Sequence, residues 1–204
     1  MIHTCAGNKF WSFHCWVLAL GWFFSSPLQA HPVIVLDPGH GGMDGGACWG
    51  GVREKNLTLM IAQRVESVLR ARGFRTAMTR RSDRTVSLGA RAAVANGYRS
   101  AMLVSIHCNA DPRHQARGIE TFYTGGAGYR LARSIHSRLD ARTATPDRGV
   151  KRKGLTVLAR SRCAAALVEC GFMTSPSERR LLVTAAYQKR IAQAIADGIT
   201  ASVR

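Results

Sequence analysis

Short continuous apolar runs alternate along the chain with longer segments in which apolar residues have helical spacing. Residues 33–37 (VIVLD) form an apolar, β-branched run that stops at Pro38-Gly39, which is typical of a buried strand. After a glycine-rich stretch, apolar residues recur every three or four positions until Gly73, as on one face of an amphipathic helix. This region therefore predicts a strand, a loop and a helix in succession.

Similar units follow along the rest of the chain. The apolar patterns predict strands over 74–79, 101–106, 118–123, 155–159 and 164–168, and helices over about 87–98, 129–142 and 185–201. A short helix is expected to begin at Ser175-Pro176-Ser177-Glu178, which has the form of a capping box. The Arg-rich stretch 142–153 is expected to be a surface connection, because it contains Pro146 and Gly149. Strands that alternate with helices indicate a single layered α/β domain.

The first thirty residues have the order of a secretory signal. Lys9 is followed by an apolar, aromatic run over 10–24 and then by small residues up to Ala30. The run of about 15 residues is shorter than the roughly 20 that span a bilayer as a helix. We therefore expect 1–30 to be a signal peptide and 31–204 the functional domain, exported to the periplasm or cell wall or secreted. An uncleaved anchor is the alternative.

The chain is strongly basic, with 29 Lys and Arg against 12 Asp and Glu. Such a charge concentrates a protein near polyanions, which outside the cytoplasm are anionic cell-wall polymers or lipid headgroups. General solubility explains the charge equally well. We expect a monomer that binds no nucleic acid, because an export signal precedes the domain and the usual recognition motifs are missing.

Four cysteines lie outside the predicted signal: Cys48, Cys108, Cys163 and Cys170. In an oxidising compartment they allow three full pairings, and the sequence does not select one. A contact between Cys108 and Cys170 is our hypothesis, because each follows a candidate site residue at the end of a buried strand.

Polar residues stand at the ends of the predicted buried strands. His40 follows the first strand, His107 follows 101–106 and Glu169 follows 164–168. Ligands collect outside the carboxyl ends of such strands in α/β sheets. Glu54 stands at the entry to the first helix, where the glycine-rich loop returns towards the strand end. We therefore expect these four residues to meet at one end of the sheet.

Two histidines and a carboxylate are a suitable ligand set for catalytic zinc, which keeps a fourth position open for water. That set would be His40, Glu54 and His107. A carboxylate that does not bind the metal must then move protons, a role that suits Glu169. The spacing alone is weak support, because the chain has no H-E-x-x-H signature and each residue has an ordinary structural reading. The coincidence of all four at one end of a sheet favours zinc.

The four candidates lie in four short segments: Asp37-Pro38-Gly39-His40-Gly41-Gly42, Glu54-Lys55-Asn56-Leu57, Ser105-Ile106-His107-Cys108-Asn109-Ala110 and Val168-Glu169-Cys170-Gly171-Phe172. In this order they resemble the signature segments of the zinc N-acetylmuramoyl-L-alanine amidases. The resemblance runs from about Val33 to Ile199. Cys108 and Cys170 depart from it, because small or hydroxyl residues are common there.

The resemblance implies a mixed, mostly parallel β-sheet flanked by helices, with a metal site at the strand ends. It implies a peptidoglycan hydrolase that cleaves the amide between N-acetylmuramic acid and the L-alanine of the stem peptide. One Zn²⁺ per chain would be held by His40, Glu54 and His107, with Glu169 catalytic. Some relatives carry a long insertion that forms an inhibitory helix over the zinc. Residues 109–168 are too few for it, so we expect an open site that needs no activator.

Several neighbouring residues keep two interpretations. Asp37 either orients a metal-bound histidine or caps the strand turn, and Asn109 either binds substrate or belongs to a turn. The glycines near His40 let the backbone pass close to the metal and substrate. The remaining histidines of the domain are expected to be solvated: His31, His114 and His136.

Two other functions share most of these features. A zinc peptidase that cuts within the stem peptide would apply the same chemistry to a different bond. A non-catalytic wall-binding module would share the export signal, the charge and a binding groove. The module would have no use for Glu169 beside an intact ligand set, whereas only the identity of the substrate separates the amidase from the peptidase.

Overall fold

Strand β1 (Val33–Pro38) forms from the first apolar run, and all six of its residues are buried. It belongs to a computed structural model that describes residues 1–2 and 31–203. The predicted signal peptide, apart from Met1 and Ile2, therefore lies outside the described residues.

A six-stranded sheet surrounds β1, in the order β4-β1-β5-β8-β6-β7. The other strands are β4 (Thr76–Met78), β5 (Ala101–Asn109), β6 (Ile119–Tyr123), β7 (Asp147–Arg152) and β8 (Ala164–Phe172). All neighbouring pairs are parallel except β6 and β8. The predicted mixed, mostly parallel sheet is therefore confirmed. A separate hairpin joins β2 (Cys48–Trp49) to β3 (Val52–Arg53).

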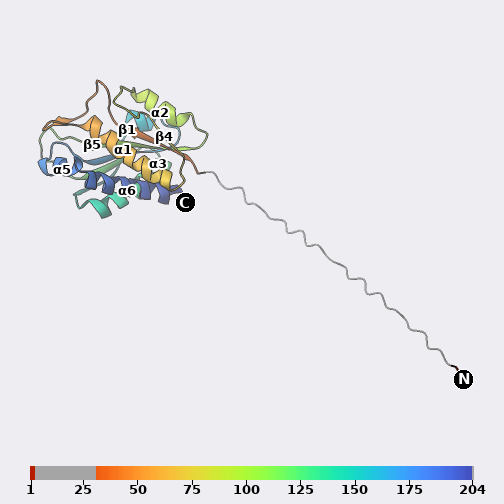
Figure 1. Ribbon diagram of the computed structural model, residues 1–204. Coiled ribbons are helices and arrows are strands. Elements are labelled where there is room, and N and C mark those ends of the chain that lie inside the picture. The colour runs from red at the N-terminus through yellow and green to blue at the C-terminus, as the bar shows by residue number, and fades with distance from the viewer. Residues whose placement is uncertain (3–30, 204) are drawn as a thin grey trace. The chain divides into compact units, whose positions relative to one another are not determined.

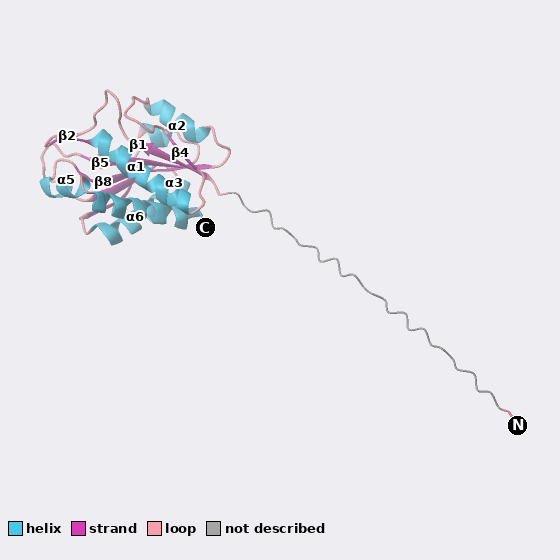
Figure 2. Ribbon diagram, in the orientation of Figure 1, coloured by secondary structure: helices cyan, strands magenta, loops and turns pink. Residues whose placement is uncertain are grey.

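Helices cover both faces of the sheet (Figure 2). The long helices α1 (Glu54–Ala71), α3 (Gly126–Thr143) and α6 (Ala185–Val203) pack with one face. The shorter α2 (Leu88–Asn96) and α4 (Thr156–Ala159) pack with the other. Figure 1 shows α2 and α6 on opposite sides of the strands. Each face of the sheet therefore has its own hydrophobic core. Because side chains alternate along a strand, Ile34 packs in the core with α1, α3 and α6, whereas Val35 packs in the core with α2 and α4.

The helix α5 (Pro176–Leu182) begins where the capping pattern predicts. The Ser175 hydroxyl accepts a hydrogen bond from the backbone N–H of Glu178. The carboxylate of Glu178, however, accepts from the backbone N–H groups of Gly118 and Phe172, each at 2.7 Å. The capping glutamate thus connects α5 to β8 and to the residue that precedes β6.

Two assignments made from the pattern are wrong. The Arg-rich stretch 142–153, expected to be a connection, contains the edge strand β7. Its exposed, charged side chains lack the apolar alternation that marks a half-buried strand. Residues 155–159, expected to be a strand, contain the short helix α4, because a brief apolar run does not separate strand from helix. The strands β5 and β8 also run further than expected, so His107 and Glu169 lie inside them.

Two expectations for single residues also fail. All four cysteines from Cys48 onwards are free, so the hypothesised bond between Cys108 and Cys170 is not formed. His136 is buried rather than solvated, and its ring lies 3.0 Å from the Thr121 hydroxyl and 2.7 Å from Asp147. These polar partners make burial of the imidazole tolerable.

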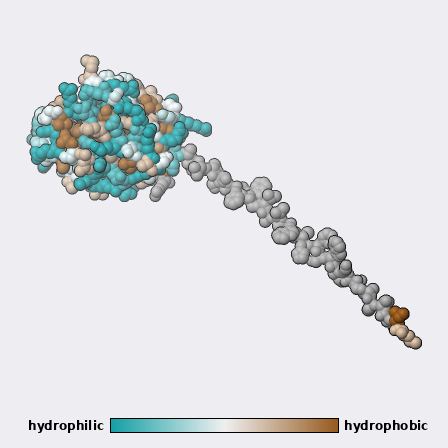
Figure 3. Space-filling view, in the orientation of Figure 1, coloured by the Kyte–Doolittle hydropathy of each residue, from teal (hydrophilic) through white to brown (hydrophobic). Residues whose placement is uncertain are grey.

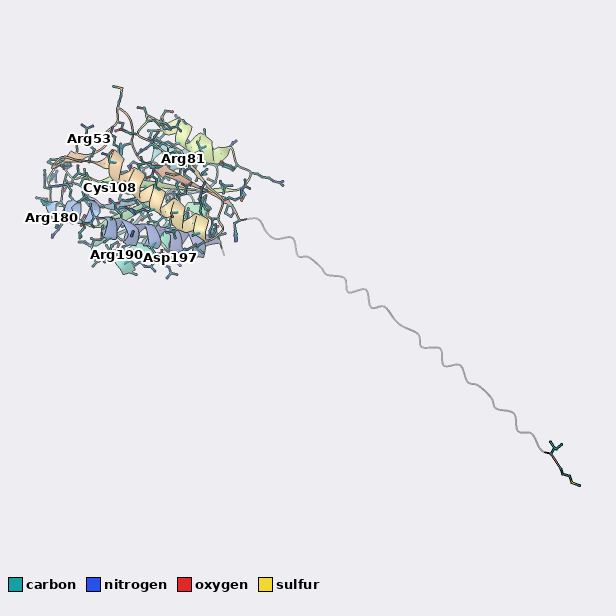
Figure 4. The ribbon with its side chains drawn as sticks, viewed as in Figure 1. Arg53, Arg81, Cys108, Arg180, Arg190 and Asp197 are labelled. Atoms are coloured by element: carbon teal, nitrogen blue, oxygen red, sulfur yellow. The ribbon has the colours of Figure 1, made fainter. Side chains whose placement is uncertain are left out.

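The surface is mainly hydrophilic on the face shown in Figure 3, with apolar residues in small groups. Figure 4 labels exposed arginines from separate segments of the chain, namely Arg53, Arg81, Arg180 and Arg190. None of the helices among the described residues has the length and apolar character needed to cross a membrane.

Candidate metal centre

Three side chains from different segments converge at the carboxyl end of the sheet. His40 follows β1, Glu54 is the first residue of α1, and His107 lies in β5. Each offers one ligand atom, and these atoms lie within 4.8 Å of one another. The Nε2 atom of His40 and the Nδ1 atom of His107 each lie 3.1 Å from an oxygen of Glu54.

The pairing of β1 with β5 brings the two histidines together. Pro38 is in register with Ile106, so His40, two residues after Pro38, lies close to His107, which follows Ile106 in β5. A Cβ atom added to Gly39 would lie 2.2 Å from the imidazole Cε1 of His107. Only glycine therefore allows the backbone of this loop to pass so close to the ring.

A second glycine, Gly46, lets the backbone of the loop pass close to Glu54 and His40. Its φ is +63°, and an added Cβ atom would lie 2.6 Å from Glu54 Oε2 and 2.7 Å from His40 Cδ2. The glycine-rich loop thus lets the chain pass close to two of the candidate ligands, as the sequence suggested.

Glu54 is buried and held from four directions. The backbone N–H groups of Ala47 and Cys108 each donate to it at 2.9 Å, and the two histidines contact its oxygens. Burial alone would raise the pKa of Glu54, but the hydrogen bonds with His107 and His40 outweigh burial and lower the pKa well below its usual range. The carboxylate is therefore ionised and fixed in place.

Asp44, which the sequence analysis did not single out, orients His40. Its Oδ2 atom lies 2.9 Å from Nδ1 of the imidazole. A proton on Nδ1 would leave Nε2 as the ligand atom facing Glu54. Burial lowers the pKa of His40, but the hydrogen bonds and charges of Glu54 and Asp44 outweigh it and raise the pKa. The only sequence signal for this role is an acidic residue four positions after the histidine, which is weak by itself.

Asp37 serves neither of its two expected roles. Its buried carboxylate accepts hydrogen bonds from Thr79 (2.6 Å), Ser105 (2.7 Å) and Arg91 (2.8 Å), and it contacts no histidine ring. These bonds connect β1 to β5, to α2 and to the residue after β4. Asp37 therefore stabilises the base of the site without touching the metal cluster.

Two buried arginines hold the backbone that carries His40. Arg91 donates to the carbonyl oxygens of Pro38 and His40, both at 2.7 Å. Arg80 donates to the carbonyls of Pro38, Gly39 and Lys55. His40 itself has a φ of +60°, a conformation that non-glycine residues seldom adopt. The arginines stabilise the loop in this strained geometry.

Glu169 lies beside the cluster, in register with His107 on the neighbouring strand. Burial raises the pKa of Glu169 to about 7, against the opposing charge of His107. Its Oε2 is the one buried side-chain oxygen or nitrogen among the described residues without a hydrogen-bond partner. A buried carboxylate oxygen that no protein group satisfies points to a catalytic or ligand-binding role.

The histidines border a cavity of about 260 Å³ that also includes Asp44, Leu88 and Val157. The side chains of His40 and His107 remain 22% and 20% exposed. Between 109 and 168, α3 packs in the core with α6, and only Val157 of α4 reaches the cavity lining. The described residues therefore leave the candidate ligands accessible.

The residues present fit a zinc ion. Two imidazole nitrogens and a fixed carboxylate match the donor types of catalytic zinc sites. Glu169 adds a carboxylate with a free oxygen next to them. The structure thus brings together all four residues that the sequence predicted. Asn109 ends β5, where its Oδ1 accepts from the backbone N–H of Ala110 at 2.8 Å and its amide donates to Glu120 at 3.1 Å.

Comparisons with known proteins agree with this geometry. The family described as N-acetylmuramoyl-L-alanine amidase matches residues 34–201. The amidase LytC of Bacillus subtilis is 37% identical over 175 residues, which cover 84% of this chain but 35% of LytC. The chain thus corresponds to about a third of that relative's length. The germination-specific amidase of the same organism is 34% identical, with 86% of this chain and 81% of that protein covered.

A solved structure shows the same fold. The amidase AmiC2 of Nostoc punctiforme aligns with a TM-score of 0.80 at 35% identity, covering 83% of this chain and 96% of that one. From the family match and these relatives, this chain belongs to the N-acetylmuramoyl-L-alanine amidase family.

Proposed function

We propose that this chain is a zinc-dependent peptidoglycan amidase that hydrolyses the bond between N-acetylmuramic acid and the L-alanine of the stem peptide. The observation that carries the proposal is the joint placement of His40, Glu54 and His107 beside a buried glutamate with one unpartnered oxygen. The family membership and the printed names of the relatives support the choice of bond.

His40, Glu54 and His107 would hold one zinc ion per chain. When bound, zinc supplies Lewis acidity, which polarises a carbonyl group and makes a water more acidic. The backbone N–H groups of Ala47 and Cys108 keep the Glu54 carboxylate in position for this role. Asp44 holds Nδ1 of the His40 ring, so that Nε2 faces Glu54 and the position that the metal would occupy.

Glu169 would move the protons of the reaction. It accepts one proton from the attacking water as the oxygen bonds to the carbonyl carbon. It passes that proton to the amide nitrogen as the C–N bond breaks. Burial raises the pKa of Glu169 above its ordinary value, which helps this carboxylate to take up a proton as well as to release one.

The domain division and the location belong to the same proposal. Residues 1–30 would direct export and residues 31–204 would form the catalytic domain, acting in the periplasm, in the cell wall or after secretion. The basic surface would hold the enzyme near anionic wall polymers. The site would work without an activator, because the described residues leave both histidines partly exposed.

The decisive experiment is a digest of purified peptidoglycan by the domain, with and without a chelator, followed by mass analysis of the products. The proposal requires free stem peptides that begin with L-alanine, and their loss on chelation. Products cut between two amino acids would instead identify a zinc peptidase. Binding without any cleavage would identify a wall-binding module.

A further inference from the structure

A second cavity, of about 530 Å³, lies at the same end of the sheet but on the side of β6 and β7. Its lining includes Asn109, Asp111, Arg113, Glu120, Arg148 and Phe172. None of these residues belongs to the candidate metal centre.

The sheet places this second cavity next to the reacting groups. Asn109 follows His107 by two residues along β5. Glu120 of β6 is the cross-strand partner of Glu169 in β8. Partners in adjacent antiparallel strands lie about 5 Å apart. The second cavity therefore lies next to Glu169, within reach of a substrate whose scissile amide meets that residue.

The acidic residues of the second cavity already have hydrogen-bond or ion-pair partners. Glu120 forms an ion pair with Lys151 and accepts a hydrogen bond from Asn109. Asp111 accepts hydrogen bonds from three backbone N–H groups, those of Arg113, Gln115 and Ala116. Neither carboxylate is left to attract a cationic ligand.

The two arginines, in contrast, keep unused donors. Arg148 lies over the ring of Phe172, 5.1 Å from its centroid, and its nearest carboxylate is Glu120 at 3.7 Å. That contact is beyond hydrogen-bond distance. The guanidinium of Arg113 is exposed and forms no ion pair with any carboxylate of the described residues. Among the described residues, neither guanidinium donates a hydrogen bond, although Arg148 is ion-paired with Glu120 at 3.7 Å, so both keep N–H donors that suit a carboxylate.

We propose that Arg113 and Arg148 bind a carboxylate of the stem peptide and so select acidic stem peptides as substrates. This inference rests on the proposed amidase function. The glycan side of the scissile bond offers no such group, because the lactyl carboxyl is consumed in the amide. The peptide side ends in a carboxylate and carries any acidic side chain. The second cavity therefore receives the peptide that leaves with the amine.

The test uses two synthetic muramoyl peptides of equal length, one with free carboxylates beyond L-alanine and one with the same groups as carboxamides. We expect the wild-type domain to cleave the acidic peptide roughly tenfold more efficiently, the effect of one charge-assisted hydrogen bond. Arg148→Gln and Arg113→Gln should raise KM for the acidic peptide with little change in kcat. The double variant should lose the preference, and Arg148→Lys should keep part of it.

Arg190→Gln is the matched control. This exposed arginine lies on α6 (Figure 4), so the substitution removes the same charge at a position away from the cavity. It should keep the tenfold preference. Unfolding temperatures of all variants establish that they remain folded. A preference that survives in the double variant, or that is lost equally in Arg190→Gln, would overturn the inference but leave the amidase function standing. Cleavage of neither peptide by the wild type would overturn both.

Discussion

The two halves of the sheet end in different kinds of polar structure. Where β1 and β5 end, Arg80 and Arg91 are almost completely buried, and their donors are used on backbone carbonyls and Asp37. Where β6 and β7 begin, at the same end of the sheet, Arg148 has a side chain 35% exposed and lies beyond hydrogen-bond distance of its nearest carboxylate. The donors of the two buried arginines are all in use, whereas Arg148 keeps donors available.

This difference separates two demands on an enzyme. Ligand atoms for a metal must be held within narrow limits, and buried, fully bonded arginines provide such rigidity around His40. Recognition of a substrate carboxylate needs groups that are solvated before binding and bonded afterwards. Substitutions in the two halves should therefore have effects of different size and kind.

The largest effect is expected for His107→Ala, which removes a ligand atom from the rigid half. Zinc content should fall from about one ion per chain to near zero, and amidase activity should fall to background. Elemental analysis and product release measure these two quantities. His114→Ala is the matched control, because His114 is exposed and contacts only Trp49 among the aromatic residues described. Full zinc content in His107→Ala would contradict the ligand assignment.

A smaller loss is expected for Glu169→Gln. Removal of a general acid and base lowers kcat by roughly 10² to 10⁴. Zinc content should stay near one ion per chain, since Glu169 is not a proposed ligand. Loss of zinc together with activity would instead make Glu169 part of the ligand set.

Arg91→Met tests the rigidity itself. Its side chain is 4% exposed and that of Asp37 is 1% exposed, so the substitution leaves a buried carboxylate without its ion-pair partner. Breaking such a pair costs about 3–5 kcal/mol in the free energy of unfolding, measurable by urea denaturation. Arg81→Gln is the control, because that arginine is 54% exposed in its pair with Glu66 and should cost less than about 1 kcal/mol. Equal losses in the two variants would remove the distinction between buried and exposed pairs.

The smallest effect is expected for Glu66→Gln, with a defined pH dependence. Burial raises the pKa of Glu66, but hydrogen bonds from Arg81 and Thr76 outweigh it and hold the pKa below the ordinary value of 4.5. A lowered pKa in the folded state means that the ion pair stabilises the fold above about pH 4.5 and that this stability is lost as the pH falls further. The difference in unfolding free energy between wild type and variant should be below about 1 kcal/mol at pH 7 and shrink towards pH 3. A difference that grows on acidification would show that the pair is not its origin.

The sequence predicted the parts of the fold in which apolar spacing is decisive. The run at 33–37 and the helical stripe from Leu57 to Leu69 are buried as expected. The first pattern is typical only of a buried strand, and the second has only the 3.6-residue repeat of a helix. β7 could not be predicted, because Arg148, Lys151 and Arg152 carry no apolar signal and the strand depends on pairing with β6. The sequence predicts a strand in place of α4, because its four apolar or neutral residues fit the two-residue repeat of a strand as well as the 3.6-residue repeat of a helix.

The candidate site divides in the same way. His40, Glu54, His107 and Glu169 could be predicted, because their motifs are local and resemble one family. The roles of Asp44 and Arg91 could not, since each depends on which groups the folded chain brings within 3 Å. Burial of His136 likewise follows from Thr121 and Asp147, which are distant from it in the sequence.

The two outer strands of the sheet have a consequence for self-association. An outer strand carries unpaired backbone groups onto which a second chain could add a strand. Here β4 is only three residues long, and β7 carries Arg148, Lys151 and Arg152, with Gly149 at a φ of +81° interrupting its regular course. Two copies that approached through β7 would bring like charges together. Arg148, which borders the second cavity, therefore also acts with Lys151 and Arg152 to protect a highly concentrated enzyme from edge-to-edge aggregation.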